Sequence, residues 1–179
     1  MLNITRRTMF AGLGTAGLAS LGLATVGLAT TPARAADGSV VKVELWDKGG
    51  SSMDKLGSEP MRGVAMPGAA MPNRAMGITA TPATIKAGVV TFEAINTSKE
   101  MVHEMIVAAL PATPKALPYI ADEQRVDEEK GEHLGEVSEL APNATGALRI
   151  TLKPGKYLLY CNVPGHYALG MWTEITVTP

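Results

Sequence analysis

Three side chains near the end of the chain have the types and the spacing of a soft metal site. Cys161, His166 and Met171 form a C-x4-H-x4-M pattern. The pattern predicts that one strand ends at the cysteine, that Pro164-Gly165 turns the chain, and that the next strand starts at the methionine. We therefore expect the thiol, the imidazole and the thioether to converge at one end of a sheet.

This donor set favours copper. A thiolate and a neutral imidazole are strong donors, and a thioether is a weak donor that prefers copper to magnesium or calcium. Zinc usually takes four firm nitrogen, sulfur or oxygen ligands, and a methionine is a poor fourth. A second imidazole would complete a site with two histidines and one cysteine, and only His103 and His133 remain. His103 starts an apolar segment and is expected to be buried, whereas His133 lies among glutamates and is expected to be hydrated, so His103 is the predicted ligand.

Each of these residues also has an ordinary structural explanation. Cys161 is the only cysteine, so an internal disulfide is excluded and the thiol is a buried filler, a reactive nucleophile or a metal ligand. A histidine in a turn often caps it, and a methionine often fills a core. Because Cys161, His166 and Met171 occur together at this spacing, with His103 on a suitable strand, metal binding is favoured over a separate structural role for each residue.

With a strand histidine upstream, the pattern resembles the cupredoxins, the type 1 or blue copper family that includes plastocyanin, azurin, auracyanin and rusticyanin. The resemblance runs from about Val40 to Thr178, apart from residues 48–76. It implies one copper per chain, held by His103, Cys161 and His166 in a trigonal plane, with Met171 as a long axial ligand.

The resemblance also implies one-electron transfer between redox partners. Electrons would pass through an exposed edge of His166, ringed by Pro164, Ala168 and Leu169, during brief encounters with a partner protein. Pro164 has no N–H to donate to the sulfur of Cys161, which would favour Cu(I).

Enzymatic functions are disfavoured. Multicopper oxidases and copper nitrite reductases place a histidine beside the type 1 cysteine, but Cys161 is flanked by Tyr160 and Asn162. A dinuclear oxidase-type site would need two cysteines. A cysteine–histidine nucleophile would leave Met171 unexplained. The sequence therefore predicts an electron-transfer protein rather than an enzyme.

Copper handling is the main alternative function. Methionines recur every five residues in a polar stretch rich in glycine and proline, with one more ahead of them: Met53, Met61, Met66, Met71 and Met76. Thioethers bind Cu(I), so this stretch could capture and deliver the ion. The alternative is that these methionines simply cover the surface of the sandwich.

The rest of the chain predicts a Greek-key β-sandwich or small barrel. Alternating apolar residues predict strands, separated by turn residues, at 40–46, 89–96, 103–110, 146–152, 156–162 and 171–178. Residues 48–76 are expected to form a long loop, and the acidic stretch 111–142 a solvated excursion with a short helix between Pro118 and Gly131. With 179 residues and a net charge of −1, one domain is expected, and the lack of a basic block argues against nucleic acid as a partner.

The first 35 residues are predicted to be an export signal, which leaves 36–179 as the cupredoxin domain. Thr5-Arg6-Arg7-Thr8 precedes an uncharged run over 9–30 and an Ala33-Arg34-Ala35 cleavage pattern, which resembles a twin-arginine signal. An ordinary secretory signal, or retention of 9–30 as a membrane anchor, are the alternatives. The expected location is the periplasm or the outer face of the cytoplasmic membrane.

Overall fold

Short β-strands make up most of the described residues. The computed structural model describes residues 38–56, 74–113 and 116–179. The described elements are β1 (Ser39–Asp47), the 3-10 helix η1 (Gly50–Lys55), β2 (Met76–Thr81), β3 (Thr84–Lys86), β4 (Gly88–Asn96), β5 (His103–Leu110), β6 (Tyr119–Ile120), β7 (Arg125–Val126), β8 (His133–Leu140), β9 (Thr145–Leu152), β10 (Gly155–Tyr160) and β11 (Trp172–Thr178).

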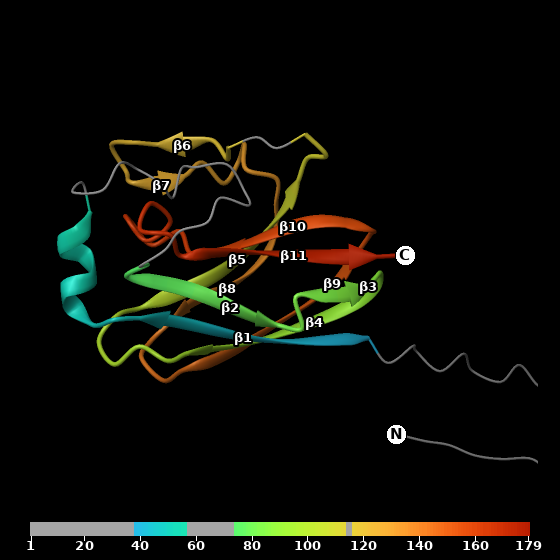
Figure 1. Ribbon diagram of the computed structural model, residues 1–179, viewed down its shortest axis with the longest axis horizontal. Helices are drawn as coiled ribbons and strands as arrows, with labels where there is room; N and C mark the ends of the chain where they lie inside the picture. The colour runs from blue at the N-terminus through green and yellow to red at the C-terminus, as the bar shows by residue number, and fades with distance from the viewer. Residues whose placement is uncertain (1–37, 57–73, 114–115) are drawn as a thin grey trace, which may run out of the picture. The chain divides into compact units, whose positions relative to one another are not determined.

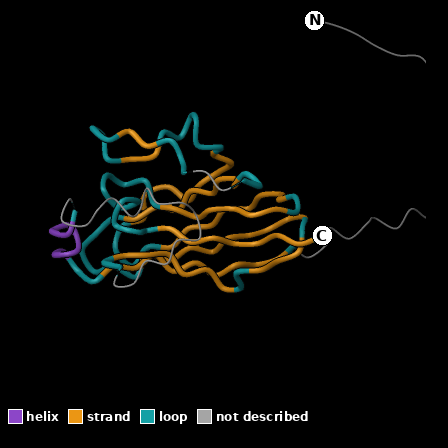
Figure 2. Tube along the Cα trace, turned by 45° about the horizontal axis from the view of Figure 1, so that its top comes forward, coloured by secondary structure: helices purple, strands orange, loops and turns teal. Residues whose placement is uncertain are grey.

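Two sheets pack face to face as a sandwich (Figures 1 and 2). One sheet has the order β2-β1-β4-β9 and the other the order β3-β11-β10-β5-β8, and the described strands do not close into a barrel. Most neighbours are antiparallel, but β1 pairs with β4, and β11 with β3, in parallel. The predicted sandwich is confirmed. An early strand, β5, and the last two strands lie in one sheet, which is the arrangement that the cupredoxin resemblance implies.

The interior between the sheets follows from the two-residue period of each strand. The predicted inward residues of the first strand, Val41, Val43 and Leu45, are all fully buried. Val90, Phe92 and Ala94, on one face of β4, are also buried. From the opposite sheet, alternate residues of β5, β10 and β11 complete the same cluster. Burying these aliphatic and aromatic side chains is the main source of stability, at about 25 cal/mol for each Å² of apolar surface.

The outer face of the five-stranded sheet is also covered, which corrects the prediction of a solvated excursion over 111–142. A second apolar cluster joins Ile106, Leu158 and Tyr160 of the sheet to Leu117 and Val126 from the excursion. The expected helix between Pro118 and Gly131 is absent, and the described residues there form the β6–β7 hairpin and turns. The glutamates that follow lie on β8, which pairs with β5. The sequence analysis missed this strand because β8 is an edge strand, and its exposed face carries charged residues instead of an apolar pattern.

Both ends of the predicted loop over 48–76 have regular structure in the described residues. Gly50–Lys55 forms η1, and Met76 is fully buried as the first residue of β2. Met61, Met66 and Met71 lie outside the described residues, as does the predicted export signal 1–35. No described helix is long and apolar enough to cross a bilayer.

Candidate metal centre

The end of the five-stranded sheet brings the predicted site residues together. β5 and β10 are neighbouring antiparallel strands. His103 is the first residue of β5, and Cys161 directly follows the last residue of β10. By the two-residue period both side chains belong to the inner face, in series with Met105 and Leu159. Position along the strand and alternation thus place an imidazole and a thiol on the same side of adjacent strand ends.

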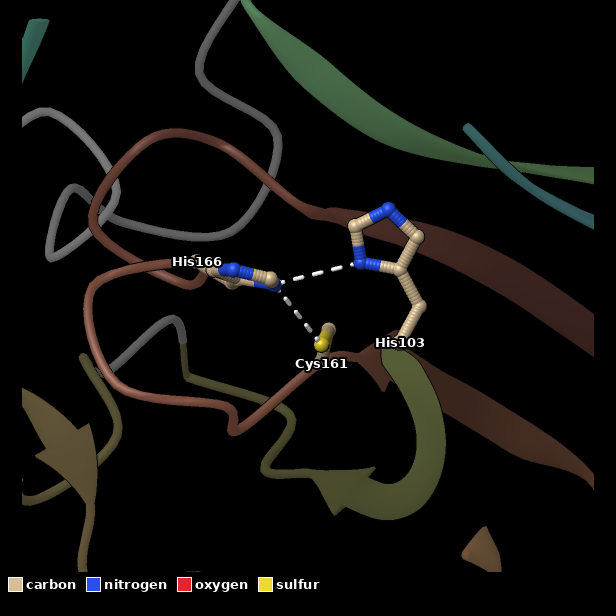
Figure 3. A group of neighbouring side chains, drawn as sticks. All are labelled: His103, Cys161 and His166. Atoms are coloured by element: carbon tan, nitrogen blue, oxygen red, sulfur yellow. Dashed lines mark hydrogen bonds between the residues drawn. The ribbon is translucent and has the colours of Figure 1, made fainter. Parts of the chain in front are cut away.

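His166 completes a compact group with these two residues (Figure 3). Its Nδ1 lies 3.2 Å from Nδ1 of His103 and 3.4 Å from Sγ of Cys161. The three donor atoms lie within 4.8 Å of one another, and all three residues are buried. His103 and Cys161 are fully buried, and His166 is 3% exposed. The structure therefore holds three converging donors in a space closed to bulk water.

Met171 lies at the base of the same loop. It is fully buried and belongs to the same apolar cluster as Cys161. Its carbonyl accepts a hydrogen bond from the N–H of Cys161 at 3.0 Å, and its own N–H donates to the carbonyl of His166 at 3.0 Å. β11 begins one residue later than predicted, at Trp172. The methionine backbone therefore ties both ends of the loop that carries His166.

The loop that carries His166 is packed under other segments. Gly165 has φ +84°, and a Cβ atom there would lie 2.9 Å from a methyl group of Leu56 and 3.1 Å from Cε of Met53. The N–H of Gly165 also donates to the carbonyl of Gln124 at 2.8 Å. Residues of η1 and of the β6–β7 hairpin thus contact the loop at Gly165. His166 is only 3% exposed, so the expected exposed edge of its ring is not observed in the described structure. Of the predicted ring around it, Pro164 is exposed, while Ala168 and Leu169 are each 8% exposed.

Asp47 is a partner of His103 that the sequence analysis did not identify. Its Oδ2 lies 2.9 Å from Nε2 of His103, and the side chain is only 2% exposed. Burial raises the pKa of Asp47, but hydrogen bonds from Ser98, His103 and Gly49 outweigh it, so the pKa is lowered overall. The signal was present in the sequence, because Asp47 continues the inward series of Val41, Val43 and Leu45 by one step.

The sulfur of Cys161 has backbone donors despite Pro164. The N–H of Glu104 lies 3.5 Å from Sγ, and hydrogen bonds from the backbone of Glu104 and Val163 act to lower the pKa of the thiol. Sequence reasoning considered only the residues that follow the cysteine, and so it missed the donor from the neighbouring strand β5. Hydrogen bonds to a ligating sulfur tune the potential of a metal site.

Glu104 itself is a half-buried carboxyl group beside the site. Its Oε1 accepts the N–H of Asn162 at 2.9 Å. Burial, followed by the negative charges of Glu128, Glu136 and Glu139, raises its pKa to about 7, although the bond from Asn162 opposes the shift. Near neutral pH this carboxyl group is therefore protonated in part of the molecules and ionised in the rest.

The protonation states of the converging donors suit metal binding. Burial lowers the pKa of His103, against the effect of Asp47. Burial and the neighbouring His103 lower the pKa of His166 to about 4. Burial raises the pKa of Cys161 to about 12. At neutral pH the imidazoles already have free lone pairs, whereas the thiol must lose a proton to a metal.

The donor chemistry fits copper. Two imidazole nitrogens and one thiol converge with a thioether residue at the base of the loop, and this combination of soft and borderline ligands suits copper better than calcium, magnesium or a four-ligand zinc site.

His133 is located elsewhere, as predicted. It forms a second, exposed group on the surface with Glu128 and Glu136. Its Nδ1 lies 4.0 Å from one glutamate and its Nε2 lies 3.7 Å from the other. The two nitrogens of one ring point to different carboxylates, so this group has the geometry of surface ion pairing.

Comparison with known proteins finds similar folds among blue copper proteins. No protein-family model matches the chain, and no curated protein matches it. Auracyanin B is 19% identical over 83% of this chain and 91% of that chain, with a TM-score of 0.48. Auracyanin A, a "blue" copper protein of the green thermophilic photosynthetic bacterium Chloroflexus aurantiacus, is 21% identical over 78% of this chain and 100% of that chain, with a TM-score of 0.47.

A third similar structure is rusticyanin from Thiobacillus ferrooxidans. It is 19% identical over 78% of this chain and 76% of that chain, with a TM-score of 0.46. At this level of identity and superposition, no role passes from these proteins to individual residues of this chain. The roles proposed below rest on the geometry and the donor chemistry of the site.

Proposed function

We propose that this chain is an exported type 1 copper protein that carries single electrons between redox partners. Its ligands are His103, Cys161 and His166, with Met171 as the weak axial ligand. The observation that carries the proposal is the convergence of two imidazoles and a thiol, within 4.8 Å of one another, in a buried pocket. Copper supplies a one-electron couple there, and the protein supplies a fixed set of donors.

The fold supports a role in electron transfer because it holds these donors with little freedom to move. His103 is anchored by a strand and by Asp47, Cys161 follows a central strand, and the backbone of Met171 ties the loop that carries His166. A site that keeps one geometry in both oxidation states reorganises little when an electron arrives or leaves.

Export and transient partners complete the proposal. The paired arginines and the A-x-A pattern before residue 36 support export to the periplasm or to the outer face of the cytoplasmic membrane. A redox partner would meet the end of the sandwich, where Pro164 is exposed close to the site. Short contacts of small area are typical of such electron-transfer encounters.

Optical and EPR spectra of the copper-loaded protein test this function. The Cu(II) form should show intense visible absorption from thiolate-to-copper charge transfer, and it should bleach and recover reversibly with a one-electron reductant and oxidant. Cys161→Ser should lose the colour. His133→Ala is the matched control and should keep it, because His133 lies outside the donor group. A colourless protein with bound copper would contradict the proposal.

Copper delivery is the second candidate function, and one contact favours it. Cε of Met53 lies 3.1 Å from the position of a Cβ on Gly165, the residue before His166, so one thioether of the methionine-rich stretch packs against the loop that carries His166. Met76 is fully buried in β2, which removes it from that stretch. A delivery protein should bind more than one Cu(I) and yield copper readily to a chelator. An electron carrier should retain one copper through repeated redox cycles.

A further inference from the structure

The inner face of the four-stranded sheet ends in a carboxylate where its pattern calls for an apolar side chain. Val41, Val43 and Leu45 of β1 are fully buried, and Asp47 occupies the next position in this series with a side chain that is 2% exposed. Burying a carboxylate costs free energy unless it is well paired. The position is therefore explained by what the carboxylate contacts.

The contact is with the far nitrogen of a proposed copper ligand. Oδ2 of Asp47 lies 2.9 Å from Nε2 of His103, which is fully buried. An ionised carboxylate only accepts hydrogen bonds, so Nε2 must carry the proton and donate it. In a neutral imidazole the lone pair is then on Nδ1, the atom 3.2 Å from Nδ1 of His166. Asp47 thus selects the tautomer whose free nitrogen belongs to the donor group.

The carboxylate is itself fixed in place. Oδ1 accepts the N–H of Gly49 at 2.6 Å, and the side chain of Ser98 also hydrogen bonds to Asp47. Ser98 is held in turn, because its Oγ accepts the N–H of Met101 at 2.9 Å. The segment that joins β4 to β5 and the end of β1 therefore position the carboxylate together.

The negative charge of Asp47 should affect the reduction potential of a bound copper ion in a definite direction. A carboxylate hydrogen bonded to a ligating imidazole makes the imidazole a stronger donor. The Asp47 carboxylate and the Cys161 thiolate together carry two negative charges. These balance the charge of Cu(II) but exceed that of Cu(I) by one, so they favour Cu(II). Because the pair is buried, water screens this effect less than it would at the surface.

We propose that Asp47 is a positioning residue that fixes the Nδ1 donor of His103 and lowers the reduction potential of the copper site. The inference rests on the proposed function for its redox part. The tautomer part concerns the metal-free protein and stands apart from copper.

The test has two readouts. In the metal-free protein, long-range ¹H–¹⁵N NMR should show His103 protonated at Nε2. In the copper-loaded protein, Asp47→Asn should weaken the preference for Cu(II) about tenfold, a rise in potential of about 59 mV for one electron. Glu44→Gln removes the same charge from an exposed position on the same strand and should leave the potential unchanged.

Each outcome supports or overturns a distinct statement. A proton on Nδ1 of His103 in the wild-type protein would overturn the inference even if no variant folds. An unchanged potential in a blue Asp47→Asn protein would overturn its redox part. Failure of the wild-type protein to form a blue site would defeat the proposed function, whereas the NMR result would still decide the role of Asp47 in holding the tautomer.

Discussion

At the scale of single residues, the sequence predicted the donors and missed what holds them. Spacing singled out Cys161, His166 and Met171, because ligands on one hairpin are close in sequence. His103 followed by elimination and by its place on an apolar strand. Asp47 escaped because its contact joins two sheets, and a pattern within one strand does not reveal which residue of the other sheet lies opposite. The Glu104 N–H beside the sulfur was missed for a different reason, because it comes from the neighbouring strand of the same sheet, far away in sequence.

The axial position gives a prediction for one residue. Met171→Leu should retain copper, since the three strong donors remain, and should raise the potential because loss of a sulfur donor favours Cu(I). A rise of about 59 mV would correspond to a tenfold change in the preference between oxidation states. Voltammetry measures it. Complete loss of copper from this variant would show that Met171 is more than a weak ligand.

A second prediction concerns Glu104 in the metal-free protein. Its folded pKa of about 7 lies above the ordinary value of 4.5 for a glutamate, so the folded state holds the proton more tightly than the unfolded state. The associated stability is fully present below pH 4.5 and is lost as the pH rises through 7. Allowing for its partial exposure, the loss is about 1–2 kcal/mol.

Glu104→Gln isolates that contribution. The amide keeps an Oε1 acceptor for the N–H of Asn162 but has no proton to lose. Denaturant unfolding at pH 5 and pH 8 should show a smaller decrease in stability for the variant than for the wild type. Equal pH dependence in the two proteins would mean that Glu104 ionises normally in the folded state.

At the scale of elements, the central strands of the two sheets were predictable from the sequence. The edge strand β8 and the β6–β7 hairpin that covers one sheet were not. β1 and β4 bury alternate residues, and β5 and β10 each bury four residues in a row, so their apolar pattern is plain. β8 carries glutamates on an exposed face, and β6 and β7 have two residues each, too short for a period to appear. The positions of these strands depend on which other strands they pair with, and the hydrophobic pattern of a short segment does not reveal that.

The loop that carries His166 gives a prediction at this scale. Gly165→Ala would place a Cβ on a residue with φ +84° and against Leu56 and Met53. It should destabilise the fold by about 1–3 kcal/mol and broaden the EPR spectrum of the copper site. Gly155→Ala is a matched control, because the added Cβ would meet its nearest atom at 3.8 Å, an ordinary contact. Equal stabilities for the two variants would show that η1 does not constrain the loop.

At the scale of the whole molecule, one end of the sandwich couples folding to metal binding. The proposed ligands come from β5 and from the segment that joins β10 to β11, and the carboxylate proposed to position His103 comes from the opposite sheet. These groups meet only when both sheets are packed. A metal that binds this arrangement but not the unfolded chain stabilises the fold by mass action. Copper should therefore raise the melting temperature, and Cys161→Ser should reduce the increase.

The same coupling predicts how many protons leave when copper binds. At pH 7 the imidazoles are neutral, since burial lowers the pKa of His103 and lowers that of His166 to about 4. The thiol is protonated, since burial raises its pKa to about 12. In Glu104→Gln, which removes the neighbouring carboxyl whose pKa is about 7, binding of Cu(II) should release a single proton, from Cys161. Calorimetry in buffers of different ionisation enthalpy measures this number, and the double variant with Cys161→Ser should release none. Below pH 4, protonation of His166 should add a second proton and weaken copper binding, so a release that stays at one would place the imidazole of His166 outside the site.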